Sequence, residues 1–389
     1  MTVWIEAVLF NHDQAAATHD ALNIRRNATE EVRLPEWQEG ICVRPEDSPA
    51  AYSLAGTHGH QITIKASFRS SNPNPHTLEI RAVDEFDDDD APADCRNVLG
   101  KVGRSTVTFA GGQSGMHTFT LHDVELWKRG VGVRETTWHW QVRDDPDDEW
   151  EYFATTRHRI YSVLDTPTAP WQQTPFNAAN TQVPWTDVLD YACWWAFGTK
   201  TADKAAGRVT KHVYALGPAV VTYDCPGGGS THYAWPNFNC TAFIDRLRGG
   251  IGNGYYLNCS DCATITSTFA NILGCDLWQS RMSGMVSFAL NEMLGIGSTV
   301  WQTCCGFGAF NYHEVAWEGA CTANEDVFDA CLQVDGDADP TTAPHTPLLP
   351  LDLRFGQPGD GVYRDRLATV AGRPNCNPQP GTRKRRMVT

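Results

Sequence analysis

Residues 258–274 have the sequence NCSDCATITSTFANILG, which predicts an amphipathic helix that starts at Cys259 and is closed by Gly274. Its apolar stripe consists of Cys262, Ile265, Phe269 and Ile272, whose spacing follows the helical period. Cys262 is therefore expected in the core. Cys259 lies instead in the first turn, where backbone N–H groups and the helix dipole stabilise a thiolate, the reactive form of cysteine.

A nucleophilic cysteine needs a base and a group that orients the base. His313 is the candidate base, because it stands at the entry to a predicted strand in the sequence FNYHEVAW, residues 310–317. The next predicted strand carries Asp329 in an apolar run, where a carboxylate is costly unless it is paired. Asp329 is thus the candidate orienting group. Asp335 is the fallback, since it also opens a Gly-Asp turn, in which aspartate is common for structural reasons.

These residues, in the order Cys, His, Asp, resemble the transglutaminase-like cysteine proteases and acyltransferases, which belong to the wider papain-like group. The resemblance covers roughly residues 240–335, and it matches the family's nucleophile, acidic residue, small residue and closing glycine to Cys259, Asp261, Ala263 and Gly274. It matches the family's histidine, tryptophan and aspartate to His313, Trp317 and Asp329. The chain departs from the family in two places: the tryptophan follows His313 by four residues instead of two, and Phe328 replaces a tryptophan before the aspartate.

The resemblance implies an α+β, papain-like core and covalent acyl transfer. His313 would take the proton of Cys259, the thiolate would attack an amide or ester carbonyl, and Asp329 would hold the imidazole. The oxyanion would meet the backbone N–H of Cys259 and a second donor, for which Trp235 and Tyr256 are candidates. We expect a protease or amidase that acts on a protein or peptide; transglutaminase-type amine transfer stays open, because the sequence does not show what resolves the acyl-enzyme.

The sequence before this region predicts a different kind of domain. Short alternating runs at residues 61–68, 77–83, 105–109, 117–121, 137–143 and 150–155 predict strands of an antiparallel β-sandwich over residues 1–165. A proline-rich stretch predicts a linker at residues 166–175, before a catalytic domain at 176–371. The predicted helices of that domain include residues 185–197 and 202–214. Residues 372–389 end in RKRRMVT and are expected to be a disordered basic tail.

Composition narrows the function classes. The formal charge of −15 over 389 residues argues against a nucleic-acid partner, and no apolar run reaches bilayer length. The N-terminus lacks a basic segment and carries Glu6 inside its apolar stretch, so we expect no signal peptide, and without a run of bilayer length we expect no membrane partner. The odd number of cysteines, 13, favours a reduced, cytoplasmic location, although a secreted protein with disulfides stays open.

Two alternatives belong to other classes of protein. A zinc site would draw its ligands from Cys259, Cys262, Cys304, Cys305 and His313, but adjacent cysteines rarely bind one ion well, so we expect no metal and no cofactor. The acidic loops at residues 84–90 and 144–149 lack the spacing of a calcium loop. The second alternative is a binding protein that has this fold without activity, because a fold alone does not establish function.

Overall fold

Two parts of the chain each have their own dense set of internal contacts. The structure is a computed structural model that describes residues 1–13, 20–41, 44–84, 97–173 and 180–389. The first unit consists of Met1–Thr166 and Gln173–Lys200, and the second consists of Pro167–Gln172 and Thr201–Thr389. The chain is a mixture of α-helices and β-strands, as the sequence predicts.

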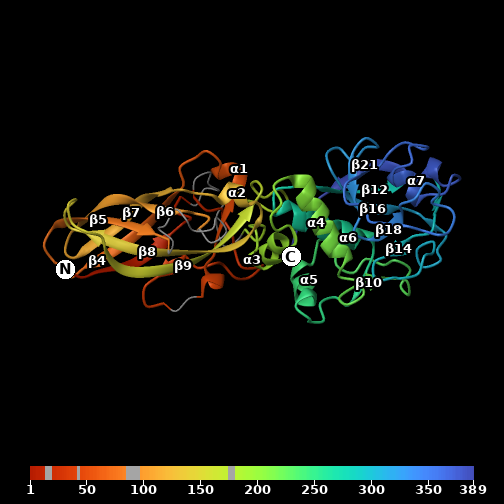
Figure 1. Cartoon of the computed structure of the whole chain (residues 1–389). Coiled ribbons are helices and arrows are strands. Elements are labelled where there is room, and N and C mark those ends of the chain that lie inside the picture. The colour runs from red at the N-terminus through yellow and green to blue at the C-terminus, as the bar shows by residue number, and fades with distance from the viewer. Residues whose placement is uncertain (14–19, 42–43, 85–96, 174–179) are drawn as a thin grey trace. The chain divides into compact units, whose positions relative to one another are not determined.

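The first unit is built on a single nine-stranded sheet, drawn from red to yellow in Figure 1. The strand order is β2-β1-β4-β7-β6-β5-β8-β9-β3, and all neighbours are antiparallel except β3 and β9. The strands are β1 (Val3–Leu9), β2 (Trp37–Gln38), β3 (Ala50–Ser53), β4 (Thr63–Ser70), β5 (His76–Val83), β6 (Lys101–Phe109), β7 (Gln113–His122), β8 (Gly132–Arg143) and β9 (Glu151–Val163). Every predicted strand overlaps one of them. The expected two-sheet sandwich is instead one curled sheet, because β6 and β7 pair at Lys101–His122 and Val102–Leu121.

The helices of the first unit are short, apart from the last. They are η1 (Pro45–Asp47), α1 (Leu54–Thr57), α2 (Leu126–Arg129) and α3 (Thr186–Trp195). The sequence predicts α3 correctly as a helix but places it in the catalytic domain, whereas the structure places it in the first unit. Hydrogen bonds hold α3 to the first unit. The Asp190 carboxylate on α3 accepts one from Arg159 (2.5 Å) and one from the Tyr161 hydroxyl (2.6 Å), both on β9.

A buried histidine lies in the core of the first unit. The His158 ring packs against Phe10 and Trp138, with ring centroids 4.8 and 5.2 Å apart, and its Nε2 is 2.8 Å from the Thr156 hydroxyl. Burial lowers the pKa of His158 to about 3, because the apolar surroundings disfavour the imidazolium. The folded state therefore keeps this histidine neutral.

This histidine is expected to make the first unit less stable in acid. Since the folded-state pKa of His158 is depressed, the unfolded chain binds the proton first, and stability is lost as the pH falls below about 6.5. Between pH 7.5 and pH 5 the loss from this group is about 2 kcal/mol. Denaturant unfolding at both pH values should show a smaller acid loss for His158→Gln than for wild type. The difference between the two proteins is the quantity to compare, because Glu36 and Asp20 have raised pKa values of about 7 and act in the opposite direction. An equal acid loss in both proteins would contradict the prediction.

The second unit combines four helices with short strands, drawn from green to blue in Figure 1. Its helices are α4 (Ala202–Tyr214), α5 (Cys240–Leu247), α6 (Cys259–Asn271) and α7 (Tyr363–Leu367), with a 3-10 turn, η3 (Arg373–Asn375). The strands are β10 (Thr222–Tyr223), β11 (Tyr256–Leu257), β12 (Trp278–Ser283), β13 (Phe288–Ala289), β14 (Leu294–Gly295), β15 (Ala309–Phe310), β16 (His313–Trp317), β17 (Asp326–Phe328), β18 (Leu332–Asp335), β19 (Pro347–Leu348), β20 (Leu353–Arg354) and β21 (Asn377–Lys384).

A five-stranded antiparallel sheet in this unit has the order β20-β17-β16-β12-β21. Every residue of β16 is buried, and α6 packs against both β16 and β12. In the register between β12 and β16, Met282 lies opposite His313 and Trp278 lies opposite Trp317. The sheet therefore fixes the predicted base at the start of a buried central strand, next to the helix that begins at Cys259.

The prediction that residues 372–389 form a disordered tail is wrong. Residues 377–384 form β21, which pairs with β12 through Gln279–Lys384 and Ser283–Asn377. The following residues pair with the segment before α5, where the Phe238 N–H bonds to the Met387 carbonyl at 2.8 Å. The proline-rich, basic composition of these residues is typical of a solvated chain end. In the structure, pairing with β12 gives the backbone of β21 hydrogen-bond partners. The Arg383 guanidinium lies 3.6 Å from the centre of the Trp278 ring, in a cation–π contact.

Candidate active site

Helix α6 begins with a capping box. The Asn258 side chain accepts a 3.0 Å hydrogen bond from the Asp261 N–H, and the Asp261 carboxylate accepts a 3.0 Å bond from the Asn258 N–H. Cys259 is therefore the first helical residue, as predicted. The helix is not amphipathic, however, because all of its residues are buried, and Cys259 itself is only 6% exposed. Three of its hydroxyls donate hydrogen bonds, those of Ser260, Thr264 and Ser267, whereas the buried hydroxyls of Thr266 and Thr268 have no partner among the described residues.

The Asp261 carboxylate also ties a neighbouring loop to the start of α6. Besides the Asn258 N–H, it accepts three backbone N–H groups, from His232 (3.0 Å), Tyr233 (2.8 Å) and Ala234 (2.8 Å). Burial raises the pKa of Asp261 despite these four donors. The resemblance matches an acidic residue at this position, and the structure gives it the task of holding residues 232–234 against the helix that carries Cys259.

The structure brings His313 and Asp329 together. His313 Nε2 lies 2.9 Å from Asp329 Oδ2, and the histidine and aspartate side chains are 0% and 1% exposed. Asp329 directly follows β17, the strand that pairs with β16. Two adjacent strands thus place the residues side by side although 16 positions separate them in sequence.

Cys259 lies near the same imidazole. Burial lowers the pKa of His313, but the charge and hydrogen bond of Asp329, together with the Cys259 thiol, outweigh burial and raise this pKa to about 10. Within the part of the chain that the structure describes, His313 Nδ1 has no hydrogen-bond partner, sulfur included. The Phe310 ring stacks on the imidazole with centroids 5.3 Å apart. The arrangement favours an imidazolium beside the sulfur.

Asp329 has two further partners that the sequence analysis missed. The Tyr363 hydroxyl, on α7, donates a 2.7 Å hydrogen bond to Asp329 Oδ2, and the Cys331 N–H donates one of 2.8 Å to Oδ1. Tyr363 is fully buried. No local pattern reveals it, because 34 residues separate the tyrosine from the aspartate.

Removal of the Tyr363 hydroxyl is expected to slow any reaction that depends on His313. Tyr363→Phe leaves Asp329 Oδ2 with the imidazole alone, which loosens the carboxylate that orients it. We expect the rate of Cys259 modification by iodoacetamide to fall about tenfold, the equivalent of ~1.4 kcal/mol. Tyr161→Phe is the matched control, since it removes a 2.6 Å tyrosine–aspartate bond in the first unit. Equal rates for Tyr363→Phe and Tyr161→Phe would show that the hydroxyl does not orient Asp329.

The fallback aspartate belongs to another cluster. Asp335 Oδ2 lies 2.6 Å from Nδ1 of His345, and Nε2 of the same ring lies 2.8 Å from Glu292 Oε2. Asp335 Oδ1 also accepts the Thr346 N–H at 2.9 Å. The structure therefore pairs Asp335 with His345 and pairs Asp329 with His313.

The two side chains considered as oxyanion donors lie on the segments that adjoin the start of α6. Trp235 follows Ala234, whose N–H binds Asp261, and it is 78% exposed. Tyr256 lies on β11, three residues before Cys259, and its hydroxyl accepts a 3.0 Å hydrogen bond from Tyr255. These contacts do not involve Cys259, so both side chains stay predictions as oxyanion donors, as does the backbone N–H of Cys259.

The cysteines around the site fall into two groups. Cys225 and Cys305 form a disulfide, whereas Cys259, Cys262 and Cys304 are free thiols. Cys262 is buried as expected, but so is every other residue of α6, so its burial does not depend on an apolar stripe. The disulfide removes Cys305 from the zinc alternative, and the described residues contain no group of three His, Cys, Asp or Glu side chains placed to hold a metal ion. Cys42 and Cys95 lie outside the described residues.

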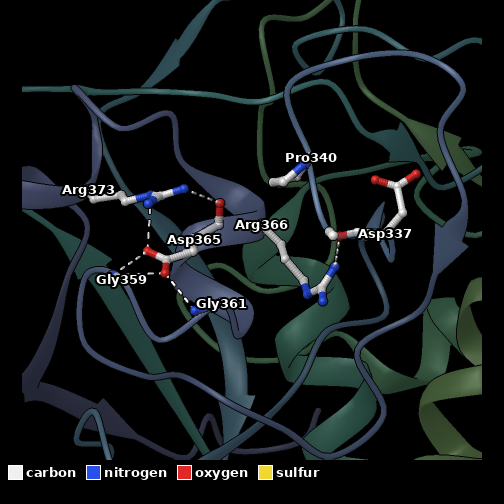
Figure 2. A pocket seen from close by; sticks show the side chains of 8 residues that line it. Asp337, Pro340, Gly359, Gly361, Asp365, Arg366 and Arg373 are labelled. Carbon is white, nitrogen blue, oxygen red and sulfur yellow. Dashed lines mark hydrogen bonds and ion pairs between the residues drawn. The ribbon is translucent and has the colours of Figure 1, made fainter.

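A cavity of about 270 Å³ lies in the second unit (Figure 2). It is lined by Asp337, Ala338, Pro340, Gly359, Gly361, Asp365, Arg366 and Arg373. The Asp365 carboxylate is occupied by the N–H groups of Gly359 and Gly361 and by Arg373 at 3.0 Å. None of the candidate catalytic residues lines this cavity.

Among the described residues, no helix is both long enough and apolar enough to cross a membrane.

Comparison with known protein families gives no match, and comparison with curated protein sequences gives none either. Among solved structures, the chain is similar to the crystal structure of red sea bream transglutaminase, with a TM-score of 0.41 and 12% sequence identity. The similarity covers 84% of this chain and 52% of the transglutaminase chain, so this chain spans about half the length of that structure.

Proposed function

We propose that the chain is a thiol-dependent acyl-transfer enzyme, a cysteine protease or amidase, with Cys259 as nucleophile, His313 as base and acid, and Asp329 as orienting group. The observation that carries the proposal is the buried 2.9 Å hydrogen bond from His313 to Asp329, on the strand against which the Cys259 helix packs. The sequence resemblance at Cys259, His313 and Asp329 supports the same assignment.

In the proposed reaction, the sulfur of Cys259 attacks the carbonyl carbon of an amide or ester while its proton resides on His313. The tetrahedral intermediate collapses when the carbon–nitrogen or carbon–oxygen bond breaks, and His313 gives its proton to the leaving group. Water then attacks the thioester, His313 takes a proton from it, and the acid is released as the thiol forms again. Asp329 keeps Nε2 of the imidazole occupied, so that Nδ1 is the nitrogen available to the sulfur.

Amine transfer differs from hydrolysis only in the second step, where a primary amine attacks the thioester instead of water. Hydrolysis is the function proposed here, because amine transfer needs a second site that excludes water. Adding a primary amine to the assay distinguishes the two: amide product in place of acid would assign the chain to the transferases.

The first experiment offers the full chain an aryl ester, p-nitrophenyl acetate, and follows acylation by intact and peptide mass spectrometry. We expect one acetyl group on Cys259, which hydrolyses in time and is absent from Cys259→Ala. Acetyl groups spread over several cysteines, or equal in Cys259→Ala, would overturn the proposal.

Cys240 provides an internal control within the same samples. It is also the first residue of a helix with an asparagine cap, since the Asn239 side chain accepts the Ala242 N–H at 3.1 Å. If the position at a helix start accounted for reactivity, Cys240 would react as Cys259 does. We expect Cys259 to react faster, because His313 lies beside it and because it is 6% exposed whereas Cys240 is 0% exposed.

A further inference from the structure

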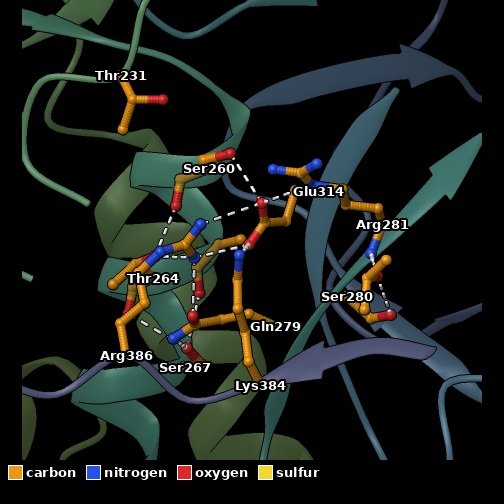
Figure 3. A network of polar contacts seen from close by, with 12 residues as sticks. Thr231, Ser260, Thr264, Ser267, Gln279, Ser280, Arg281, Glu314, Lys384 and Arg386 are labelled. Atoms are coloured by element: carbon orange, nitrogen blue, oxygen red, sulfur yellow. Dashed lines mark hydrogen bonds and ion pairs between the residues drawn. The ribbon is translucent and has the colours of Figure 1, made fainter. Parts of the chain in front are cut away.

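A buried network links the residue after the candidate nucleophile to the residue after the candidate base (Figure 3). Ser260 follows Cys259, and its hydroxyl donates a 2.8 Å hydrogen bond to Oε2 of Glu314, the residue that follows His313. The Glu314 side chain is 0% exposed. A carboxylate at such a depth requires a positive partner.

Arg386 supplies that partner from the last residues of the sequence. Its guanidinium bonds to both carboxylate oxygens of Glu314, at 2.6 and 3.2 Å, and its side chain is only 4% exposed. Arg281 and Lys384 add positive charge at 3.4 and 3.8 Å. Burial raises the pKa of Glu314, but Arg386, Lys384 and the Ser260 hydroxyl outweigh it and lower this pKa, so the carboxylate is charged.

The same guanidinium extends the network along the helix. Arg386 Nη1 donates 2.8 Å bonds to the Thr264 hydroxyl and to Gln279 Oε1. Gln279 in turn donates a 3.0 Å bond to the Ser267 hydroxyl. Ser260, Thr264 and Ser267 are four and three positions apart, so they form one face of α6. This polar face of the helix is thereby bound to β12 and, through Glu314, to β16.

We propose that Arg386 is a positioning residue, which acts through Glu314 and Ser260 to fix the start of α6 against β16. The proposal rests on the proposed function, because it concerns the distance between the sulfur of Cys259 and the imidazole of His313. Arg386 binds Glu314, which follows His313, and Glu314 binds Ser260, which follows Cys259. A shift of about 1 Å between reacting groups lowers rates by up to about 100-fold, so a rigid connection at this place affects reactivity directly.

The test compares four variants of the full chain: Arg386→Met, Arg386→Lys, Ser260→Ala and Arg383→Met. Arg383 is the matched control, because it is an exposed arginine on β21 that lies over Trp278 instead of binding Glu314. For each protein, the rate of Cys259 alkylation by iodoacetamide is measured, together with kcat and KM for p-nitrophenyl acetate and the thermal unfolding midpoint. Alkylation needs only the thiol and its base, so it reports their arrangement independently of a substrate.

We expect Arg386→Met to lower the alkylation rate and kcat at least tenfold with KM unchanged, and Arg386→Lys to recover part of the loss. Arg383→Met should match wild type. Ser260→Ala, which removes one hydroxyl only, should lower both rates severalfold, and it keeps the proposal testable if Arg386→Met does not fold. In a Ser260→Ala/Arg386→Lys double variant, losses smaller than the product of the single losses would show that both residues act through Glu314.

The acylation of wild-type Cys259 tests the proposed function separately from the positioning role of Arg386. If Cys259 of the wild type is not acylated selectively, the proposed function fails. If it is acylated selectively, but Ser260→Ala and Arg386→Lys alkylate at the wild-type rate, the positioning role of Arg386 fails while the proposed function stands. If the alkylation rate and kcat of each variant fall only in proportion to the fraction of protein that is unfolded, the network stabilises the fold and the positioning role of Arg386 also fails.

Discussion

Replacing His313 with asparagine is expected to lower the rate of Cys259 acylation by roughly 10³- to 10⁴-fold, because it removes the group that holds the thiol's proton. His313 Nε2 bonds to Asp329 at 2.9 Å, and asparagine can keep a hydrogen bond to this carboxylate without accepting a proton from sulfur. The measurement is single-turnover acetylation by p-nitrophenyl acetate at pH 7.5, with thermal unfolding as a check on folding.

His345 gives this experiment a matched control. Its ring lies 2.6 Å from Asp335 and 2.8 Å from Glu292, so it is also a histidine held by carboxylates in the second unit. His345→Asn is expected to acylate at close to the wild-type rate. A large loss in His345→Asn with His313→Asn unaffected would transfer the role of base to His345 and that of orienting group to Asp335.

Replacing Asp261 with alanine is expected to destabilise the second unit by about 3 to 5 kcal/mol, because a buried carboxylate that satisfies several donors disappears at once. The donors left without it are the backbone N–H groups of His232, Tyr233, Ala234 and Asn258. Denaturant unfolding followed in the second unit measures the loss. Asp261→Asn should lose less, since its carbonyl oxygen still accepts some of these bonds.

The control for this change is Asp245→Ala. Asp245 is exposed and accepts the Gly252 N–H at 2.9 Å, so its loss is expected to cost at most about 1 kcal/mol. Equal destabilisation by both alanine variants would show that water replaces the carboxylate at residue 261 as readily as at the surface. Acylation of Cys259 should also slow in Asp261→Asn, because the capping box sets the start of its helix.

Several features of the second unit follow from short-range patterns in the sequence. The helix start at Cys259 is one, because its cap joins Asn258 to Asp261, three residues away. The strand that begins at His313 is another. In each case the interactions that decide the structure join residues within one turn of helix or along one strand, and their spacing is visible in the sequence.

Long-range partners were not predictable in the same way. The choice of Tyr363 as a partner of Asp329 depends on where α7 packs, 34 residues further along the chain. The sequence predicts that α3 belongs to the catalytic domain, because the proline-rich stretch before it indicates a domain boundary. In the structure α3 belongs to the first unit, because Asp190 on α3 accepts a hydrogen bond from Arg159 on β9.

The sequence by itself determined that a cysteine begins a helix and that a histidine begins a strand after it, because capping and periodicity are local properties. Only the tertiary structure decided that His313 bonds to Asp329 while Asp335 bonds to His345, since Asp329 follows β17, which pairs with β16, whereas Asp335 ends β18 in a different sheet. It also decided that Arg386, 122 residues from Thr264, binds the helix of Cys259 in place of solvent. Burial of Glu314 is the physical reason, because a charge inside the protein requires an opposite charge wherever the chain can supply one.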